Sequence, residues 1–156
     1  MPFWRLFYHV VWATKGREPS LDPARQETVR RVVSTACRDI GVIVHAVGTM
    51  PDHVHVVASV PPAMALATAI GRWKGSAAHA INHGTGAGTE APDRSIFVWQ
   101  AEYGVLSCGE RALPDVLAYV RDQPRRHAAG ELLSALERTA PPAADGERTR
   151  GGMSRG

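Results

Sequence analysis

Apolar residues fill the segment from Leu6 to Trp12 at almost every position. A short run of β-branched and aromatic residues that is apolar on both faces is typical of a strand in the middle of a sheet. The runs from Val42 to Val47 and from His53 to Val60 are also predicted to be strands, with a turn at 48–52 between them. Neighbouring strands joined by so short a turn are expected to pair in antiparallel fashion.

Three further segments repeat apolar residues at helical spacing. The first helix is predicted to start after Asp22, which can cap it ahead of Pro23, and to end at Gly41. The second runs from Leu66 to Ile81, and the third starts at Leu113. The stripe of the third helix consists of Leu113, Val116, Leu117 and Val120.

Between the last two helices lie a loop and one more strand region. Residues 82–94 are rich in Gly, Thr and Pro and are expected to form a loop. Residues 96–99 and 103–107 predict either one strand with a break or a short hairpin. The order β-α-β-β-α-β-α predicts an α+β fold of ferredoxin-like (RRM-like) type. It has an antiparallel sheet with helices on one face, and the last helix is appended to that core.

The chain has 156 residues, which favours a single domain. We expect this domain to span residues 1–139, with a disordered tail at 140–156 that is rich in Pro, Gly, Arg and Ala. The apolar stretch from Leu6 to Ala13 is too short to cross a membrane and lacks the flanks of a signal peptide. A cytoplasmic protein is the expectation.

The two cysteines and the charge narrow the class of protein further. Cys37 and Cys108 have neither the number nor the spacing of a disulfide scaffold or a CxxC site, so two free thiols in a reducing compartment are expected. The net charge of +3 and the pI of about 9.2 favour a phosphate-bearing partner over a cationic one.

The triplet His53-Val54-His55 carries the clearest candidate chemistry. Side chains alternate along a strand, so both imidazoles are expected on one face and Val54 on the core face. Two neutral imidazoles side by side can hold one metal ion. An isolated pair arises readily by chance, but histidines in a core strand need partners, because the burial of unpaired polar groups is costly.

Tyr119 and Gln123 stand four residues apart in the third predicted helix and are therefore expected to share a face. Taken alone, such a pair is typical of a packing tyrosine and a solvated amide. Pro124 follows directly, and proline disfavours helical geometry in the residue before it, so the helix is expected to kink or end there.

Four ordered stretches resemble single-strand DNA transposases of the insertion-sequence-200-like type, among which REP-associated tyrosine transposases are the most similar subgroup. The stretches are Tyr8–Lys15, Gly48–His55, Trp73–Ser76, and a block of Trp99–Gln100, Tyr103–Gly104 and Tyr119–Gln123. They cover most of residues 4–128. Any one of them is a weak signal, but four in order form a specific pattern.

The resemblance implies a role for each matching position. Tyr119 corresponds to the nucleophile, His53 and His55 to two ligands of Mg²⁺ or Mn²⁺, and Gln123 to the third protein ligand. Asp52 adjoins these ligands as a candidate outer partner. The implied reaction cuts and rejoins single-stranded DNA through a covalent 5′-phosphotyrosine, with a hairpin or palindrome as the expected substrate.

Cations near these positions are candidate DNA contacts. Lys15, Arg17 and Lys74 are predicted to bind the DNA backbone, although each is also typical of a solvated surface charge. The resemblance also allows a homodimer, in which the tyrosine of one subunit completes the site of the other.

Three alternatives remain open at this point. A replication or conjugation nickase would use the same histidines and tyrosine, although such proteins are often larger. A nucleic-acid-binding module would bind DNA without forming a covalent adduct. In a small-ligand regulatory domain, the histidines would be structural and Tyr119 would be a packing residue.

Overall fold

The structure is a computed structural model of the chain, and it describes residues 2–84 and 96–140. Residues 85–95 of the expected loop and residues 141–156 of the expected tail lie outside the described part. The two predictions made for those segments therefore remain predictions.

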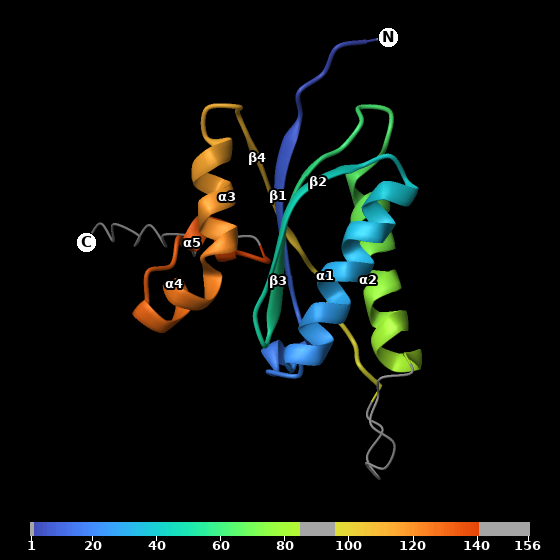
Figure 1. Cartoon of the computed structure of the whole chain (residues 1–156), viewed down its shortest axis with the longest axis vertical. Helices are drawn as coiled ribbons and strands as arrows, with labels where there is room; N and C mark the ends of the chain where they lie inside the picture. Colours follow the sequence, from blue (N-terminus) through green and yellow to red (C-terminus); the bar gives the residue numbers. More distant parts are fainter. Residues whose placement is uncertain (1, 85–95, 141–156) are drawn as a thin grey trace, which may run out of the picture.

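Four strands form one antiparallel sheet in the order β2-β3-β1-β4. They are β1 (Phe7–Ala13), β2 (Ile43–Thr49), β3 (His53–Ser59) and β4 (Gly104–Cys108). The two central strands are β1 and β3, and every residue of β3 is buried. This arrangement confirms the predicted ferredoxin-like sheet (Figure 1).

Small differences from the predicted strands concern their ends. β2 continues through Thr49, so the tight connection to β3 starts two residues later than predicted. Trp99 makes only an isolated antiparallel bridge, to Thr14, and β4 pairs antiparallel with β1 just before that point. The Trp99 bridge and β4 therefore lie along the same side of β1, which matches the predicted single strand with a break.

Two long helices cover one face of the sheet (Figure 1). They are α1 (Pro23–Asp39) and α2 (Leu66–His83). The predicted cap is confirmed, since the Asp22 side chain accepts a hydrogen bond from the Arg25 amide at 2.8 Å. Gly41 follows α1 with a φ of 74°, a conformation that glycine adopts without strain.

Three short helices lie on the opposite face (Figure 1). They are α3 (Leu113–Arg121), α4 (Gln123–Ala129) and α5 (Ser134–Glu137). Gly130 ends α4 with a φ of 70° and lets the chain turn back toward the sheet. α5 contacts both β1 and β4, so this helical layer is attached to the sheet at both ends.

The break between α3 and α4 confirms the expectation drawn from Pro124. Helix α3 ends at Arg121, and Pro124 lies in the first turn of α4. Placing Tyr119 and Gln123 in one continuous helix was therefore wrong. A proline has no amide hydrogen to donate to the preceding turn, so the chain starts a new helix instead.

Two glycines allow the helical layer to approach the sheet closely. A Cβ atom at Gly48 would lie 2.6 Å from the carbonyl oxygen of Val120, and Gly48 is paired with His55 across β2 and β3. A Cβ atom at Gly104 would overlap the carbonyl of Arg138. Both ends of the layer thus rest directly on strand backbone.

The described residues include both cysteines and the helices α1 to α5. None of the described helices is long and apolar enough to cross a membrane. Cys37 is buried and Cys108 is partly buried, and both are free thiols, as predicted.

Candidate active site

The site starts with the alternation of side chains along β3. Val54 and Val56 pack into the apolar cluster beneath α1 and α2, while His53 and His55 point to the opposite face. Both imidazoles are almost completely buried. The predicted placement of the two histidines on one face is therefore confirmed.

Each imidazole is held through its Nδ1 atom by a neighbouring side chain. Nδ1 of His53 lies 2.6 Å from Oδ1 of Asp52, and Nδ1 of His55 lies 2.8 Å from Nε2 of His9 on β1. Burial, with the neighbouring His55 ring, lowers the pKa of His9 to about 3 and keeps it neutral. These contacts fix the ring orientations, as outer partners of metal-binding histidines do.

The two Nε2 atoms have no hydrogen-bond partner among the described residues, although both are buried. Both lie near Oε2 of Glu137, at 3.3 Å from His53 and 3.4 Å from His55, without hydrogen-bond geometry. Together with His127, these residues offer four ligand atoms within 4.8 Å of one another. Unsatisfied buried nitrogens that converge on a carboxylate are a suitable donor set for a divalent cation.

Tyr119 is 1% exposed, and its ring centroid lies 6.2 Å from that of His55. Its hydroxyl donates to Oε1 of Glu137 at 2.6 Å and accepts from the amide of Leu133 at 3.1 Å. The guanidinium of Arg126 lies 4.9 Å from the ring centroid. Burial, and then the hydrogen bond to Glu137, raises the pKa of Tyr119, so the phenol is protonated at neutral pH.

Gln123 is fully buried beside the same cluster, although it begins a new helix. Its Nε2 atom donates to the Tyr119 carbonyl at 3.3 Å, and its Oε1 atom lies 2.8 Å from Nε2 of His127. The structure thus brings Gln123 to Tyr119 and to His55, with the amide oxygen directed to His127.

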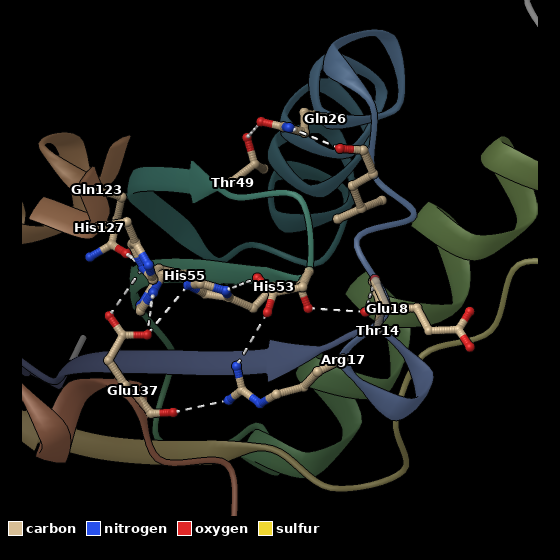
Figure 2. A network of polar contacts seen from close by, with 12 residues as sticks. Thr14, Arg17, Glu18, Gln26, Thr49, His53, His55, Gln123, His127 and Glu137 are labelled. Carbon is tan, nitrogen blue, oxygen red and sulfur yellow. Dashed lines mark hydrogen bonds and ion pairs between the residues drawn. The ribbon is translucent and has the colours of Figure 1, made fainter. Parts of the chain in front are cut away.

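Glu137 carries the anion of the site. Burial tends to raise its pKa, but the interactions with His55, Tyr119 and His53 outweigh burial and lower the pKa to about 2. The carboxylate is therefore ionised at neutral pH. Figure 2 shows it directed toward the two histidines of β3.

Arg17 connects two parts of the site from the short turn after β1, η1 (Lys15–Arg17). Its guanidinium lies 3.7 Å from Oδ2 of Asp52 and donates to the Glu137 carbonyl at 3.4 Å (Figure 2). Its φ of 54° is unusual for a residue with a Cβ atom, and such backbone conformations concentrate at functional sites.

The other two predicted DNA contacts lie outside this cluster. Lys15 is exposed, and its ammonium makes no hydrogen bond or ion pair with the described residues. The ammonium of Lys74 instead donates to the carbonyls of Gln100, Ala101 and Glu102. Lys74 therefore holds the connection that precedes β4.

Sequence reasoning missed His9, His127 and Glu137. His9 lies on β1, on the same face of the sheet as His53 and His55. Its contact with His55 depends on the register of β1 against β3, which the sequence does not reveal. His127 lies one helical turn after Gln123, which was a usable signal. Nothing in the sequence around Glu137 indicates that the chain turns back to the histidines there.

Comparison with known proteins identifies the family. The family model described as "Transposase IS200 like" matches residues 2–123. The transposase for insertion sequence element IS200 of Salmonella typhimurium is 24% identical over 131 residues, which cover 84% of this chain and 85% of the relative. The corresponding transposase of Salmonella typhi matches equally well.

Two solved structures share the fold. A putative transposase from Deinococcus radiodurans has a TM-score of 0.61 at 23% identity, covering 78% of this chain and 93% of its own. A REP-associated tyrosine transposase bound to a REP hairpin has a TM-score of 0.60 at 15% identity, covering 81% and 74%. The resemblance seen in the sequence is confirmed, and because the family match spans residues 2–123 of 156, this protein belongs to the IS200-like transposases.

Proposed function

We propose that this transposase cuts and rejoins single-stranded DNA through a covalent 5′-phosphotyrosine on Tyr119, with Mg²⁺ or Mn²⁺ held by His53 and His55. One observation carries the proposal: the Tyr119 hydroxyl and the two unpartnered Nε2 atoms meet at the same carboxylate. A packing tyrosine and two structural histidines have no need to share a partly buried anion.

A divalent cation at such a site neutralises phosphate oxygens and polarises the phosphorus. His53 and His55 would hold it through Nε2, since Asp52 and His9 already engage the Nδ1 atoms. Gln123 remains the proposed third ligand. To bind the metal, the Gln123 amide oxygen would have to give up its contact with His127.

The phenol attacks phosphorus, so a Tyr119 O–P bond forms while the bond to the DNA 3′-oxygen breaks. The pKa of Tyr119 is raised by burial and its hydroxyl is protonated, so proton loss has to accompany the attack. The carboxylate of Glu137, 2.6 Å away, is in place to accept that proton. The leaving 3′-oxygen takes a proton and becomes a free hydroxyl.

The energy of the cut bond is retained in the phosphotyrosine. A 3′-hydroxyl of a second strand can therefore displace Tyr119 and rejoin the DNA without ATP. The reverse displacement by the original 3′-hydroxyl reseals the strand. Transfer and resealing use the same residues.

The substrate is proposed to be a hairpin-bearing single strand. A phosphate held in a duplex cannot reach a site enclosed between the sheet and a helical layer, whereas an unpaired strand can bend into it. The structural relative bound to a REP hairpin supports this class of substrate. Lys15 and Arg17 remain the proposed backbone contacts, and Lys15 lines a hollow of about 380 Å³ with Arg25 and Val98.

A labelled hairpin with a single-stranded flank tests the proposal. Incubation with Mn²⁺ followed by a denaturing gel should give a protein-linked DNA band for the native chain, and Tyr119→Phe should remove it. The variant lacks only the attacking oxygen, and loss of the nucleophile in other enzymes costs several orders of magnitude in rate. Tyr103→Phe is the matched control, because Tyr103 is 38% exposed and its ring lies near Lys74.

Two outcomes would contradict the proposal. A persistent adduct in Tyr119→Phe would assign the nucleophile to another residue. Hairpin binding without any adduct in the native chain, across varied hairpins and both metals, would favour a binding module.

A further inference from the structure

Helix α5 brings a carboxylate to the histidines from outside the stretch that the family model matches. That match ends at residue 123, whereas Glu137 is the last residue of α5. Its side chain is only 15% exposed. The family match therefore does not account for the anion that faces His53 and His55.

The proton on His53 makes this contact unusual. Nδ1 lies 2.6 Å from a carboxylate oxygen of Asp52, so Nδ1 carries the proton that Asp52 accepts. In the neutral ring, Nε2 is then a bare lone pair, and it lies 3.3 Å from the Glu137 carboxylate. Two electron-rich atoms at this distance repel each other unless a positive charge, either a second proton on the ring or a metal ion, lies between them.

The separations match those of atoms that share one ion. Ligand atoms about 2.1 Å from a cation and roughly 90–110° apart are separated by roughly 3.0–3.4 Å. Oε2 of Glu137 lies 3.3 Å from Nε2 of His53 and 3.4 Å from Nε2 of His55. Each Nε2 atom can therefore lie next to the Glu137 oxygen around one divalent cation.

The charge of the donor set leads to the same conclusion. Two imidazoles and the amide of Gln123 are neutral, whereas Mg²⁺ and Mn²⁺ prefer oxygen ligands and are usually bound by at least one carboxylate. Oε1 of Gln123 is also engaged by His127. Glu137 is the residue of the cluster that supplies a negative charge.

We propose that Glu137 is a direct ligand of the metal, binding it through Oε2 while Oε1 holds the hydroxyl of Tyr119. The inference rests on the proposed function, whose metal site it completes. One carboxylate would then fix the distance between the metal and the attacking oxygen. A segment beyond the matched residues becomes part of the active site.

Binding of Mn²⁺ alone to the full chain, measured by calorimetry without DNA, tests this role. His55→Ala should abolish binding at the site, and Glu137→Gln should weaken it by roughly 10- to 100-fold, the range found when supporting groups of metal sites are removed. Glu137→Asp keeps the charge but is one methylene shorter, so an intermediate affinity is expected. Glu131→Gln is the matched control, because Glu131 is exposed and pairs with Arg125.

A second readout separates the metal site from the ligand assignment. Pulsed electron paramagnetic resonance should detect nitrogen couplings from imidazole in the native Mn²⁺ complex and in the residual complex of Glu137→Gln. Circular dichroism verifies the fold of each variant, and Glu137→Asp provides the comparison if Glu137→Gln does not fold.

The outcomes distinguish the two proposals. If the native chain binds no Mn²⁺ that depends on His55, the proposed metal site itself fails. If that binding is present and the Glu137 variants match native affinity within about twofold, the metal site stands and Glu137 is not a ligand. Equal losses in Glu137→Gln and Glu131→Gln would also overturn the inference, since the effect would then come from net charge.

Discussion

The two faces of the sheet are built from the same strands, but polar residues are concentrated on only one of them. Beneath α1 and α2, residues such as Val10, Trp12 and Val54 form a large apolar cluster. On the other face, the alternate positions carry His9, His53 and His55 under the short helices. Burial of polar groups costs free energy, whereas burial of apolar groups is favourable. Packing on the apolar face must therefore offset the cost of burying the histidines.

The difference separates the residues that maintain the fold from those that perform the chemistry. A single strand serves both purposes because its side chains alternate. A change on one face should therefore affect stability, and a change on the other should affect activity. Substitutions on each face test that separation.

The largest effect is expected for His55→Ala, with His53→Ala behaving alike. Cleavage of the labelled hairpin in Mg²⁺ should fall by at least about 100-fold, because one metal-binding nitrogen is lost. The apolar face is unchanged, so circular dichroism should report a folded protein. Excess Mn²⁺ should restore part of the activity through the remaining imidazole.

His79→Ala is the control for the histidine variants, because His79 is exposed on α2. Its cleavage rate should equal that of the native chain. Equal cleavage by the native protein with and without a chelator would contradict the metal requirement.

Trp73→Ala addresses the apolar face. Trp73 is fully buried on α2 and its indole nitrogen has no partner among the described residues, so its contribution is mainly apolar packing. The free energy of unfolding in urea should fall by about 3–5 kcal/mol. Arg72→Ala, at the exposed neighbouring position, should change it by less than about 0.5 kcal/mol.

If Trp73→Ala abolished Mn²⁺ binding while its stability stayed native, the two faces would not be separable. Residual Mn²⁺ affinity in the folded fraction of the variant is the quantity to compare.

A smaller contrast is expected between two lysines. Lys15→Ala should weaken hairpin binding a few-fold, because a phosphate contact is lost. The slope of the logarithm of the binding constant against the logarithm of the salt concentration should become less steep by about 1. Lys74→Ala should leave DNA affinity unchanged and lower stability by about 1 kcal/mol, since its ammonium holds three carbonyls. Fluorescence anisotropy at several salt concentrations measures the first effect. A DNA defect in Lys74→Ala with native stability would support the DNA contact predicted from the sequence.

No recovery of activity is expected when Tyr119→Phe and His55→Ala are mixed. The layer that carries Tyr119 is attached to its own sheet at Gly48 and again through α5, so an exchange between subunits would have to break both attachments. The adduct assay on equilibrated mixtures measures the outcome. Recovery in mixtures shown to contain heterodimers would establish a site shared between subunits.

Alternation and local breakers were sufficient to predict much of the fold. The two-residue period of β3 fixed the faces of His53 and Val54, the capping signal at Asp22 located the start of α1, and Pro124 located a helix end. Each is a property of a few neighbouring residues, which is why the sequence alone reveals it.

The missing parts of the site depend on contacts between distant segments. His9 meets His55 only through the register of β1 against β3, and Glu137 arrives only because the chain reverses after Gly130. The pattern of neighbouring residues does not predict contacts between segments that are distant in the sequence. The predicted ligand set therefore lacked the residues that the tertiary structure supplies.

The close contact at Gly48 has a consequence for the order of events during strand transfer. With the Val120 carbonyl against the β2 backbone, α3 cannot move closer to the sheet. If this contact between α3 and β2 is kept while the phosphotyrosine exists, the DNA strands have to move instead. The rate of rejoining would depend on the effective concentration of the incoming 3′ end, which a tether such as a hairpin raises into the millimolar range, about that of short flexible linkers.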